Sequence, residues 1–282
     1  MEDLDFTQPS ESPVYDPAAA KAFFQAAGKA ETVAAGKSFF AEREGGGFFS
    51  SDDRMYLLLE GSVALTIGGK ALDTVKPGEV FGELATITDS KRSATAIAKT
   101  DCKVIALDGK QFQKAMGKTP GFALMLMSIM IDRIRLRLAR LTMMKALPDK
   151  IATNERRVFD ESTLNEISQE LGTPRPLKFT AGQTIINAGE TGVLMYMVRE
   201  GHVSIRADGK LIERVGPGGV FGEMALVDRA PRAASAAAET DSSLMAVNRK
   251  QFLDLIQTNP EFGMSLLKVL GQRLQAVTLP AK

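Results

Sequence analysis

Two stretches of the chain combine a glycine and a glutamate with an arginine nine residues after the glutamate. The first runs Phe81-Gly-Glu-Leu-Ala85 and is followed by Arg92, and the second runs Phe221-Gly-Glu-Met-Ala225 and is followed by Arg232. A glycine lets backbone N–H groups approach a ligand closely. The carboxylate can accept a hydrogen bond from a sugar hydroxyl, and the charged, forked guanidinium suits phosphate oxygens. This combination predicts a site for a ligand with one phosphate and one ribose hydroxyl.

Small residues follow each arginine, namely Ser93-Ala94 and Ala233-Ala234. They leave backbone N–H groups open to the same anion. In the empty site we expect the glutamate and the arginine to compensate each other's charge in part. The alternative is that each pair is a buried ion pair that only braces a turn.

Both stretches belong to a long internal repeat. Tyr56 to Phe112 aligns without a gap onto Tyr196 to Phe252, and 24 of the 57 paired residues are identical. A duplicated core keeps its apolar periodicity, but packing alone gives no reason to keep the Gly-Glu pair and the arginine in both copies. The repeat therefore indicates two ligand sites in one chain.

Short strands separated by turn signals surround each stretch. The pattern predicts strands at Tyr56 to Gly61, Ser62 to Ile67 and Ala71 to Val75, with hairpin turns at Gly68-Gly69 and at Asp208-Gly209. Strands this short and this regularly interrupted are typical of a small barrel or jelly roll. The predicted fold class is α+β, with two tandem β jelly-roll domains that each carry flanking helices.

Helices are predicted on both sides of these strands. Asp16-Pro17 opens a helix to Ala27, with the aspartate as N-cap and the proline in the first turn. Further helices are expected from about Lys110, from Gly121 to Ala146 and from Glu261 to about Val277.

The predicted domain organisation has four parts. Residues 1–16 form a disordered tail, 17–147 the first domain, 148–176 a helical linker and 177–282 the second domain. The linker includes an amphipathic segment from Thr163 to Leu171. The first copy also has six extra residues within Arg43 to Asp53, which are either a mobile contact loop or a tolerated surface insertion.

Composition narrows the function classes. The chain has 282 residues, a net charge of +1, one cysteine (Cys102) and one histidine (His202). A single histidine argues against a metal centre and against Ser-His-Asp or Cys-His catalysis, so we expect no enzyme activity and no metal. The lone cysteine, the acidic N-terminus and the lack of a bilayer-length apolar run predict a soluble, cytoplasmic protein.

The residues around the two arginines resemble a known motif. Phe221 to Leu226 followed by Pro231 to Ser235 is similar to the phosphate-binding cassette of cyclic-nucleotide-binding domains, such as those of protein kinase A regulatory subunits and the bacterial catabolite activator protein. Phe81 to Ala85 with Arg92 to Ala94 resembles the same cassette, although Lys91 stands in place of the usual proline. The resemblance covers about residues 30–145 and 170–280.

The resemblance implies a role for each matching residue. The glutamates would hold the ribose 2′-hydroxyl, the arginines the cyclic phosphate, and the branched aliphatic residues of two strands the base. The implied residues of site 1 are Leu65, Leu72, Gly82, Glu83, Leu84, Ala85, Arg92, Ser93 and Ala94. The implied residues of site 2 are Ile205, Ile212, Gly222, Glu223, Met224, Ala225, Arg232, Ala233, Ala234 and Thr278.

Base preference follows from the residue after each arginine. In the family a threonine there favours cGMP, so Ala233 argues for cAMP at site 2, while Ser93 is compatible with either nucleotide. Thr278 is a weak candidate for a polar base contact. Its counterpart in the repeat is Leu138, so such a contact is not duplicated.

The resemblance implies a cytoplasmic receptor for cAMP, or else cGMP, in signal transduction. Two non-equivalent sites would give allosteric regulation of an unidentified effector protein. The alternative is an interaction scaffold whose cassettes no longer bind ligand. Only four residues follow Thr278, so we expect no helix-turn-helix and no nucleic-acid partner. The methionine-rich segment Met125 to Met144 is either a partner or homodimer face, or is buried against its own domain.

Overall fold

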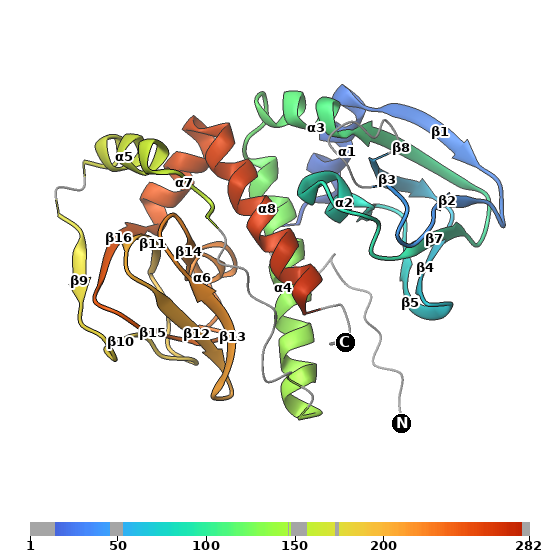
Figure 1. Ribbon diagram of the computed structural model, residues 1–282. Coiled ribbons are helices and arrows are strands. Elements are labelled where there is room, and N and C mark those ends of the chain that lie inside the picture. The colour runs from blue at the N-terminus through green and yellow to red at the C-terminus, as the bar shows by residue number, and fades with distance from the viewer. Residues whose placement is uncertain (1–14, 46–52, 146, 148–156, 173–174, 278–282) are drawn as a thin grey trace. The chain divides into compact units, whose positions relative to one another are not determined.

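The computed structural model describes residues 15–45, 53–145, 147, 157–172 and 175–277. The chain divides into two compact units, residues 1–129 and 130–282, and each is described by itself (Figure 1). Most of the predicted tail, the core of the six-residue insertion, part of the linker and Thr278 lie outside the described residues. The predicted domain boundaries stay a prediction.

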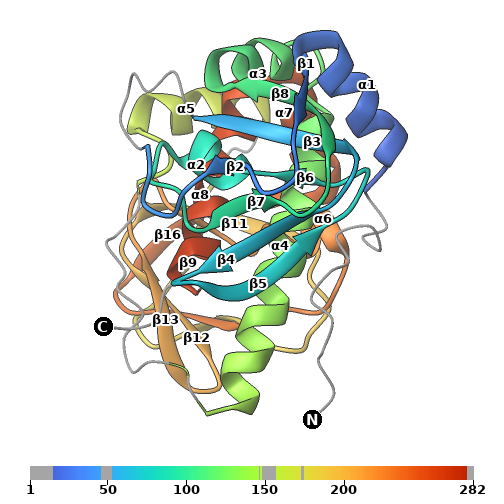
Figure 2. The same ribbon diagram turned by 90° about the vertical axis from the view of Figure 1, so that its right-hand side faces the viewer.

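Unit 1 contains two four-stranded antiparallel sheets. Their strand orders are β1-β8-β3-β6 and β2-β7-β4-β5, and Figure 2 shows β4 and β5 toward the viewer. The strands are β1 (Lys29–Val33), β2 (Ser38–Phe40), β3 (Arg54–Glu60), β4 (Val63–Ile67), β5 (Lys70–Val75), β6 (Val80–Phe81), β7 (Thr95–Ala98) and β8 (Cys102–Asp108). Strands that are distant in sequence pair within each sheet, as in a jelly roll.

The core of unit 1 fixes the start of the first Gly-Glu stretch. Phe81 is buried and its ring stacks on Tyr56, with the ring centroids 5.1 Å apart. Phe40 and Leu58 belong to the same buried cluster. The residue before Gly82 is therefore held by an apolar core rather than by a surface loop.

Four helices begin in the described part of unit 1. They are α1 (Pro17–Ala27), α2 (Glu83–Thr88), α3 (Gly109–Met116) and α4 (Phe122–Met143), and α4 crosses the division between the units. The Asp16 side chain accepts a hydrogen bond from the backbone N–H of Ala18, as the N-cap prediction requires. Tyr15, in the segment predicted to be disordered, is instead buried, and its hydroxyl donates to the carbonyl of Gly78. Because its hydroxyl has a hydrogen-bond partner, the Tyr15 side chain can be buried without leaving a polar group unpaired.

Unit 2 repeats the same topology. Its sheets have the orders β14-β11-β16-β9 and β10-β15-β12-β13, which match those of unit 1 strand for strand. Its elements are α5 (Glu161–Glu170), β9 (Leu177–Phe179), β10 (Thr184–Ile186), β11 (Leu194–Glu200), β12 (Val203–Ala207), β13 (Lys210–Val215), β14 (Val220–Phe221), α6 (Met224–Asp228), β15 (Ser235–Ala238), β16 (Ser242–Asn248), α7 (Arg249–Thr258) and α8 (Pro260–Ala276). The predicted α+β fold with two tandem jelly rolls and flanking helices is confirmed.

Local geometry agrees with the turn predictions. Gly68 and Gly69 both have positive φ between β4 and β5, and Asp208 and Gly209 do the same between β12 and β13. These conformations match the twist of a two-residue hairpin. The short helices α2, which begins at Glu83, and α6, which begins just after Glu223, were not predicted because they are too short to show helical periodicity.

Within the described residues, no helix is both long enough and apolar enough to cross a membrane. The same part of the chain contains no group of three or more His, Cys, Asp or Glu side chains arranged to hold a metal ion.

Candidate functional site

Each candidate site begins at a glycine that turns the chain from a strand into a helix. Gly82 has φ of 75° and Gly222 has φ of 82°, a left-handed conformation that disfavours other residues. A Cβ atom at Gly222 would lie 2.8 Å from Nη1 of Arg232, and one at Gly82 would lie 3.1 Å from Nη1 of Arg92. Packing therefore does give a reason to keep glycine and arginine together, contrary to the expectation from the repeat.

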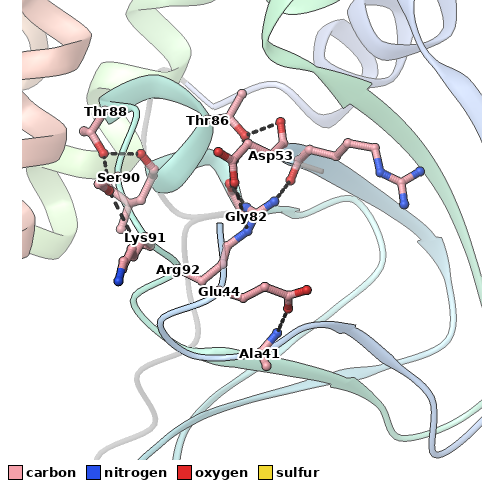
Figure 3. Close-up of polar contacts among 11 residues, drawn as sticks. Ala41, Glu44, Asp53, Gly82, Thr86, Thr88, Ser90, Lys91 and Arg92 are labelled. Atoms are coloured by element: carbon pink, nitrogen blue, oxygen red, sulfur yellow. Dashed lines mark hydrogen bonds and ion pairs between the residues drawn. The ribbon is translucent and has the colours of Figure 1, made fainter. Parts of the chain in front are cut away.

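Arg92 is held in a buried cage at site 1 (Figure 3). Its Nη1 donates to the carbonyl oxygen of Gly82 at 2.8 Å, and its Nη2 donates to that of Arg54 at 2.8 Å. The ring of Phe40 lies 4.3 Å from the guanidinium carbon, which is a cation–π contact. The residue is only 3% exposed, and this burial lowers the pKa of Arg92, while nearby Asp53 acts in the opposite direction.

Asp53 gives the arginine of site 1 a carboxylate partner. Its Oδ1 lies 3.9 Å from Nε of Arg92, and both side chains are largely buried. At that distance inside a protein, the attraction between opposite charges is substantial. The charge that a phosphate would use at site 1 is therefore already partly compensated.

The remaining predicted residues of site 1 come from three regions of unit 1. Glu83 is 4% exposed at the start of α2, and Ala85 and Ala94 are also buried. Leu65 on β4 and Leu72 on β5 are half-buried, as are Leu84 and Ser93, while Lys91 is exposed.

Arg232 at site 2 makes the same two backbone contacts. Its Nη1 donates to the carbonyl oxygen of Gly222 at 2.6 Å, and its Nη2 donates to that of Leu194 at 2.5 Å. Burial lowers the pKa of Arg232, with opposing contributions from Tyr196 and Glu223. Among the residues that the structure describes, no carboxylate oxygen forms an ion pair with Arg232. Its charge is available to an anion.

Glu223 pairs with an arginine that sequence reasoning missed. Its Oε1 accepts a hydrogen bond from Nη1 of Arg273 on α8 at 2.7 Å, and Arg273 also pairs with Glu213 at 2.8 Å. Burial alone would lower the pKa of Arg273, but the two carboxylates raise it above its ordinary value. The expected partial compensation between Glu223 and Arg232 is present as a charge interaction that acts to raise the pKa of Arg232, but the cation that hydrogen-bonds Glu223 is Arg273 on α8.

The second oxygen of Glu223 has no partner. Glu223 is 1% exposed, and its Oε2 makes no hydrogen bond within the described structure. Leaving such a group unpaired costs about 1–3 kcal/mol or more for a charged group. A buried acceptor of this kind, in the same pocket as Arg232, is suited to a hydroxyl group of a ligand.

A pocket at site 2 brings the predicted residues together. It encloses about 580 Å³ of space, part of which is open solvent. The predicted residues that line it are Ile205, Ile212, Gly222, Glu223, Met224, Ala225, Arg232, Ala233 and Ala234. Thr278 lies outside the described residues.

Two further lining residues come from α4. Arg135 pairs with Asp228 at 2.5 Å and donates to the carbonyl oxygen of Pro231 at 2.8 Å, and Leu138 lies one turn further along the helix. No local pattern predicts a site role for these residues, because a helix face shows its apolar spacing but not which loop it contacts. Arg273 did have a signal, since the 140-residue offset of the repeat pairs it with Arg133.

Comparison with known proteins identifies the two regions. The model of the cyclic nucleotide-binding domain matches residues 49–119 and 176–259, together more than half of the chain. The cAMP-dependent protein kinase regulatory subunit of Eremothecium gossypii is 25% identical over 72% of this chain and 40% of its own length. That of Colletotrichum orbiculare is 31% identical over 67% of this chain and 43% of its own length.

Bacterial proteins are similar over a shorter region. The CRP-like cAMP-activated global transcriptional regulator of Mycobacterium tuberculosis is 35% identical over 36% of this chain and 47% of its own length. Among solved structures, the catabolite activator protein of Thermus thermophilus aligns with 31% identity and a TM-score of 0.37, covering 42% of this chain and 58% of that one. The chain spans less than half the length of each of these three curated relatives.

Proposed function

The chain belongs to the cyclic nucleotide-binding domain family, and on this basis we propose that it is a cAMP receptor with two non-equivalent sites. The observation that carries the proposal is the state of site 2. Within the described residues, Arg232 forms no ion pair with a carboxylate and Oε2 of Glu223 is buried without a hydrogen bond, and both residues line one pocket. These are the two groups that a ribose cyclic phosphate would satisfy at once.

Each part of the ligand has a matching group at site 2. The phosphate would pair with Arg232 through charge-assisted hydrogen bonds. The ribose 2′-hydroxyl would donate to Oε2 of Glu223, which Arg273 holds in place through Oε1. Backbone N–H groups beside Gly222 and Ala233 are close enough to the pocket to add to the phosphate contacts.

The base would lie against apolar side chains. Ile205 and Ile212 line the pocket from neighbouring strands. Ala233 has no hydroxyl that could bind the amino group of guanine. Guanine's additional polar groups would therefore be buried without hydrogen bonds, which costs binding free energy. We therefore propose cAMP as the preferred ligand of site 2, with cGMP as a weaker ligand.

Site 1 is proposed to bind the same ligand less tightly. Glu83 and Arg92 have the positions of Glu223 and Arg232, and Ser93 can add a hydroxyl contact to the phosphate. Asp53, however, already lies beside Arg92, and a phosphate would be repelled by this carboxylate.

The output is proposed to be a change in binding to an effector protein rather than catalysis. The similar proteins named as regulatory subunits support this reading. Ligand at either site would shift the chain between states that fit the effector differently. We propose a cytoplasmic location. A second copy of the chain, in a homodimer, is the alternative to an effector protein as its partner.

Calorimetry with cAMP and cGMP would test the proposal. We expect Arg232→Ala to lower cAMP affinity at site 2 by about 30-fold to several thousand-fold, since losing one partner of a charged contact costs about 2–5 kcal/mol. Arg92→Ala should remove site 1 alone. Arg229→Asn is a matched control, because Arg229 is an exposed cation three residues before Arg232 with a φ of 57° that asparagine tolerates.

The scaffold alternative makes the opposite prediction. If the wild-type chain releases no heat with either nucleotide, and no nucleotide raises its melting temperature, the cassettes do not bind ligand and the receptor proposal is wrong. Equal binding by the wild type and the Arg92→Ala, Arg232→Ala double variant would also contradict it, because binding would then occur elsewhere.

A further inference from the structure

Helix α4 contributes to the pocket of site 2 although it precedes the second copy of the repeat by some 30 residues. Arg135 is fixed against the cassette of site 2 by two contacts, one to Asp228 and one to the carbonyl oxygen of Pro231. Asp228 ends α6 and Pro231 directly precedes Arg232. The helix is therefore tied to the same loop that would hold the phosphate.

Leu138 lies one turn beyond this attachment. Residues three apart on a helix share a face, so the Arg135 contacts also direct Leu138 toward the pocket. Leu138 is buried and is one of the pocket's lining residues. Leu138 thus gives the pocket of site 2 an apolar surface from α4.

The described lining of the pocket is divided by polarity. The charged lining groups Glu213, Glu223, Arg232 and Arg273 are joined by hydrogen bonds or electrostatics around the Gly-Glu turn. Both oxygens of Glu213 accept from Arg273, and the charged lining residue Arg135 is paired with Asp228. Ile205 and Ile212 come from strands β12 and β13, and together with Leu138 they supply apolar surface. A cyclic nucleotide bound by its phosphate and ribose would therefore present its base to aliphatic side chains.

We propose that Leu138 is the base-contacting residue of site 2, and that the site holds adenine by apolar contact without recognising its 6-amino group. The proposal rests on the proposed function of the site. A pocket built to hydrogen-bond a substrate group rejects an analogue lacking that group by about 10⁴–10⁵, whereas an apolar pocket discriminates far less. Site 2 would thus recognise the cyclic ribose phosphate strongly and the edge of the base weakly.

The test compares cAMP with purine riboside 3′,5′-cyclic monophosphate, in which hydrogen replaces the 6-amino group. Both are titrated calorimetrically into the full chain carrying Arg92→Ala, so that site 2 is measured alone. We expect the two affinities to agree within about fivefold, since no hydrogen bond to the amino group is lost.

Substitutions of Leu138 test whether this residue contacts the base. Leu138→Ala should weaken both ligands by the same factor, about 10-fold, because apolar contact with the base is lost. Leu138→Met preserves the volume and should bind both ligands within about threefold of the parent. Leu138→Ser should favour cAMP over its deamino analogue, because its hydroxyl can accept from the amino group.

Each failure has a distinct meaning. If no cyclic nucleotide binds, the proposed function is wrong and this inference falls with it. If cAMP binds but its deamino analogue is weaker by more than about 30-fold, the 6-amino group is recognised and the inference alone is overturned. Thr278→Val then shows whether Thr278 is the group that recognises it. If Leu138→Ala is folded and binds both ligands as the parent does, Leu138 does not contact the base.

Discussion

The two sites share a backbone frame but differ in how their charges are compensated. In both, the arginine donates to the carbonyl of the cassette glycine and to a carbonyl at the start of a strand, that of Arg54 in site 1 and Leu194 in site 2. Site 1 adds the carboxylate of Asp53 at 3.9 Å. In site 2 the residue before the strand is Val193, which is exposed. The cassettes are alike, and the difference between the sites comes from residues outside them.

The side chain at the sheet position of Phe40 also differs between the two sites. Phe40 and Ile186 pair with equivalent residues of the repeat, Ala96 and Ala236, so they have the same place in their sheets. Only Phe40 can make a cation–π contact with its arginine. The charge of Arg92 is thus stabilised in the empty protein by an aromatic ring and a carboxylate. The charge of Arg232 is stabilised less by its surroundings and can interact more strongly with a ligand.

The largest effect is expected from removing the cation that compensates Glu223. Arg273→Met would leave Glu213 and Glu223 buried without a partner, and breaking a buried pair in this way costs about 3–5 kcal/mol. The free energy of unfolding, measured in urea, should fall by that amount. The control is Arg214→Met, which breaks the more exposed pair with Glu239 and should cost less than about 1 kcal/mol.

The pH dependence of that variant identifies the cause. Burial without a cation raises the pKa of a carboxyl group in the folded state. A raised carboxyl pKa makes stability greatest at low pH and removes it as the pH rises through the folded-state pKa. The deficit of Arg273→Met should therefore be smaller near pH 5 than near pH 8. An equal deficit at both values would indicate lost packing instead of unpaired charge.

A reciprocal exchange tests the role of Asp53. Asp53→Asn should raise cAMP affinity at site 1 by about tenfold, because the phosphate no longer approaches a carboxylate. Val193→Asp should lower affinity at site 2 by a similar factor, and because Val193 is exposed the substitution should leave the fold intact. Titrations of each variant at 50 and 300 mM salt should show a smaller difference at high salt. If neither substitution changes the affinity for cAMP, the electrostatic explanation is wrong.

The smallest effect is expected from the residue after each arginine. Ser93→Ala should weaken cAMP binding at site 1 by about two- to tenfold, the worth of one hydrogen bond. Ala233→Ser should strengthen binding at site 2 by a comparable or smaller factor. Equal affinities for the parent and Ser93→Ala would show that the hydroxyl does not reach the ligand.

Local signals made the fold and the cassettes predictable. Turn glycines and alternating apolar residues located the strands, and the repeat located Glu83, Arg92, Glu223 and Arg232. The partners of these groups were not predictable in the same way. The 140-residue offset pairs Asp53 with Val193, so the repeat gives no signal for a carboxylate beside Arg92.

Residues on helices were the hardest to assign from sequence. Apart from the repeat, which pairs Arg273 with Arg133, both Arg273 and Arg135 look like ordinary solvent-facing arginines of amphipathic helices, because periodicity shows a helix face but not what packs against it. Their ion pairs with Glu223 and Asp228 depend on tertiary contacts across 50 and 93 residues. Charge compensation therefore had to be taken from the structure.

The central claim is that the two sites bind cAMP with unequal affinity because Asp53 forms an ion pair with Arg92, whereas no carboxylate of the described residues forms one with Arg232. Calorimetric titration of cAMP into the single-site variants Arg232→Ala and Arg92→Ala measures site 1 and site 2 separately. The account predicts that site 2 binds at least about tenfold more tightly, with a further gain at site 1 when Asp53→Asn is added. Equal affinities, or tighter binding at site 1, would contradict it.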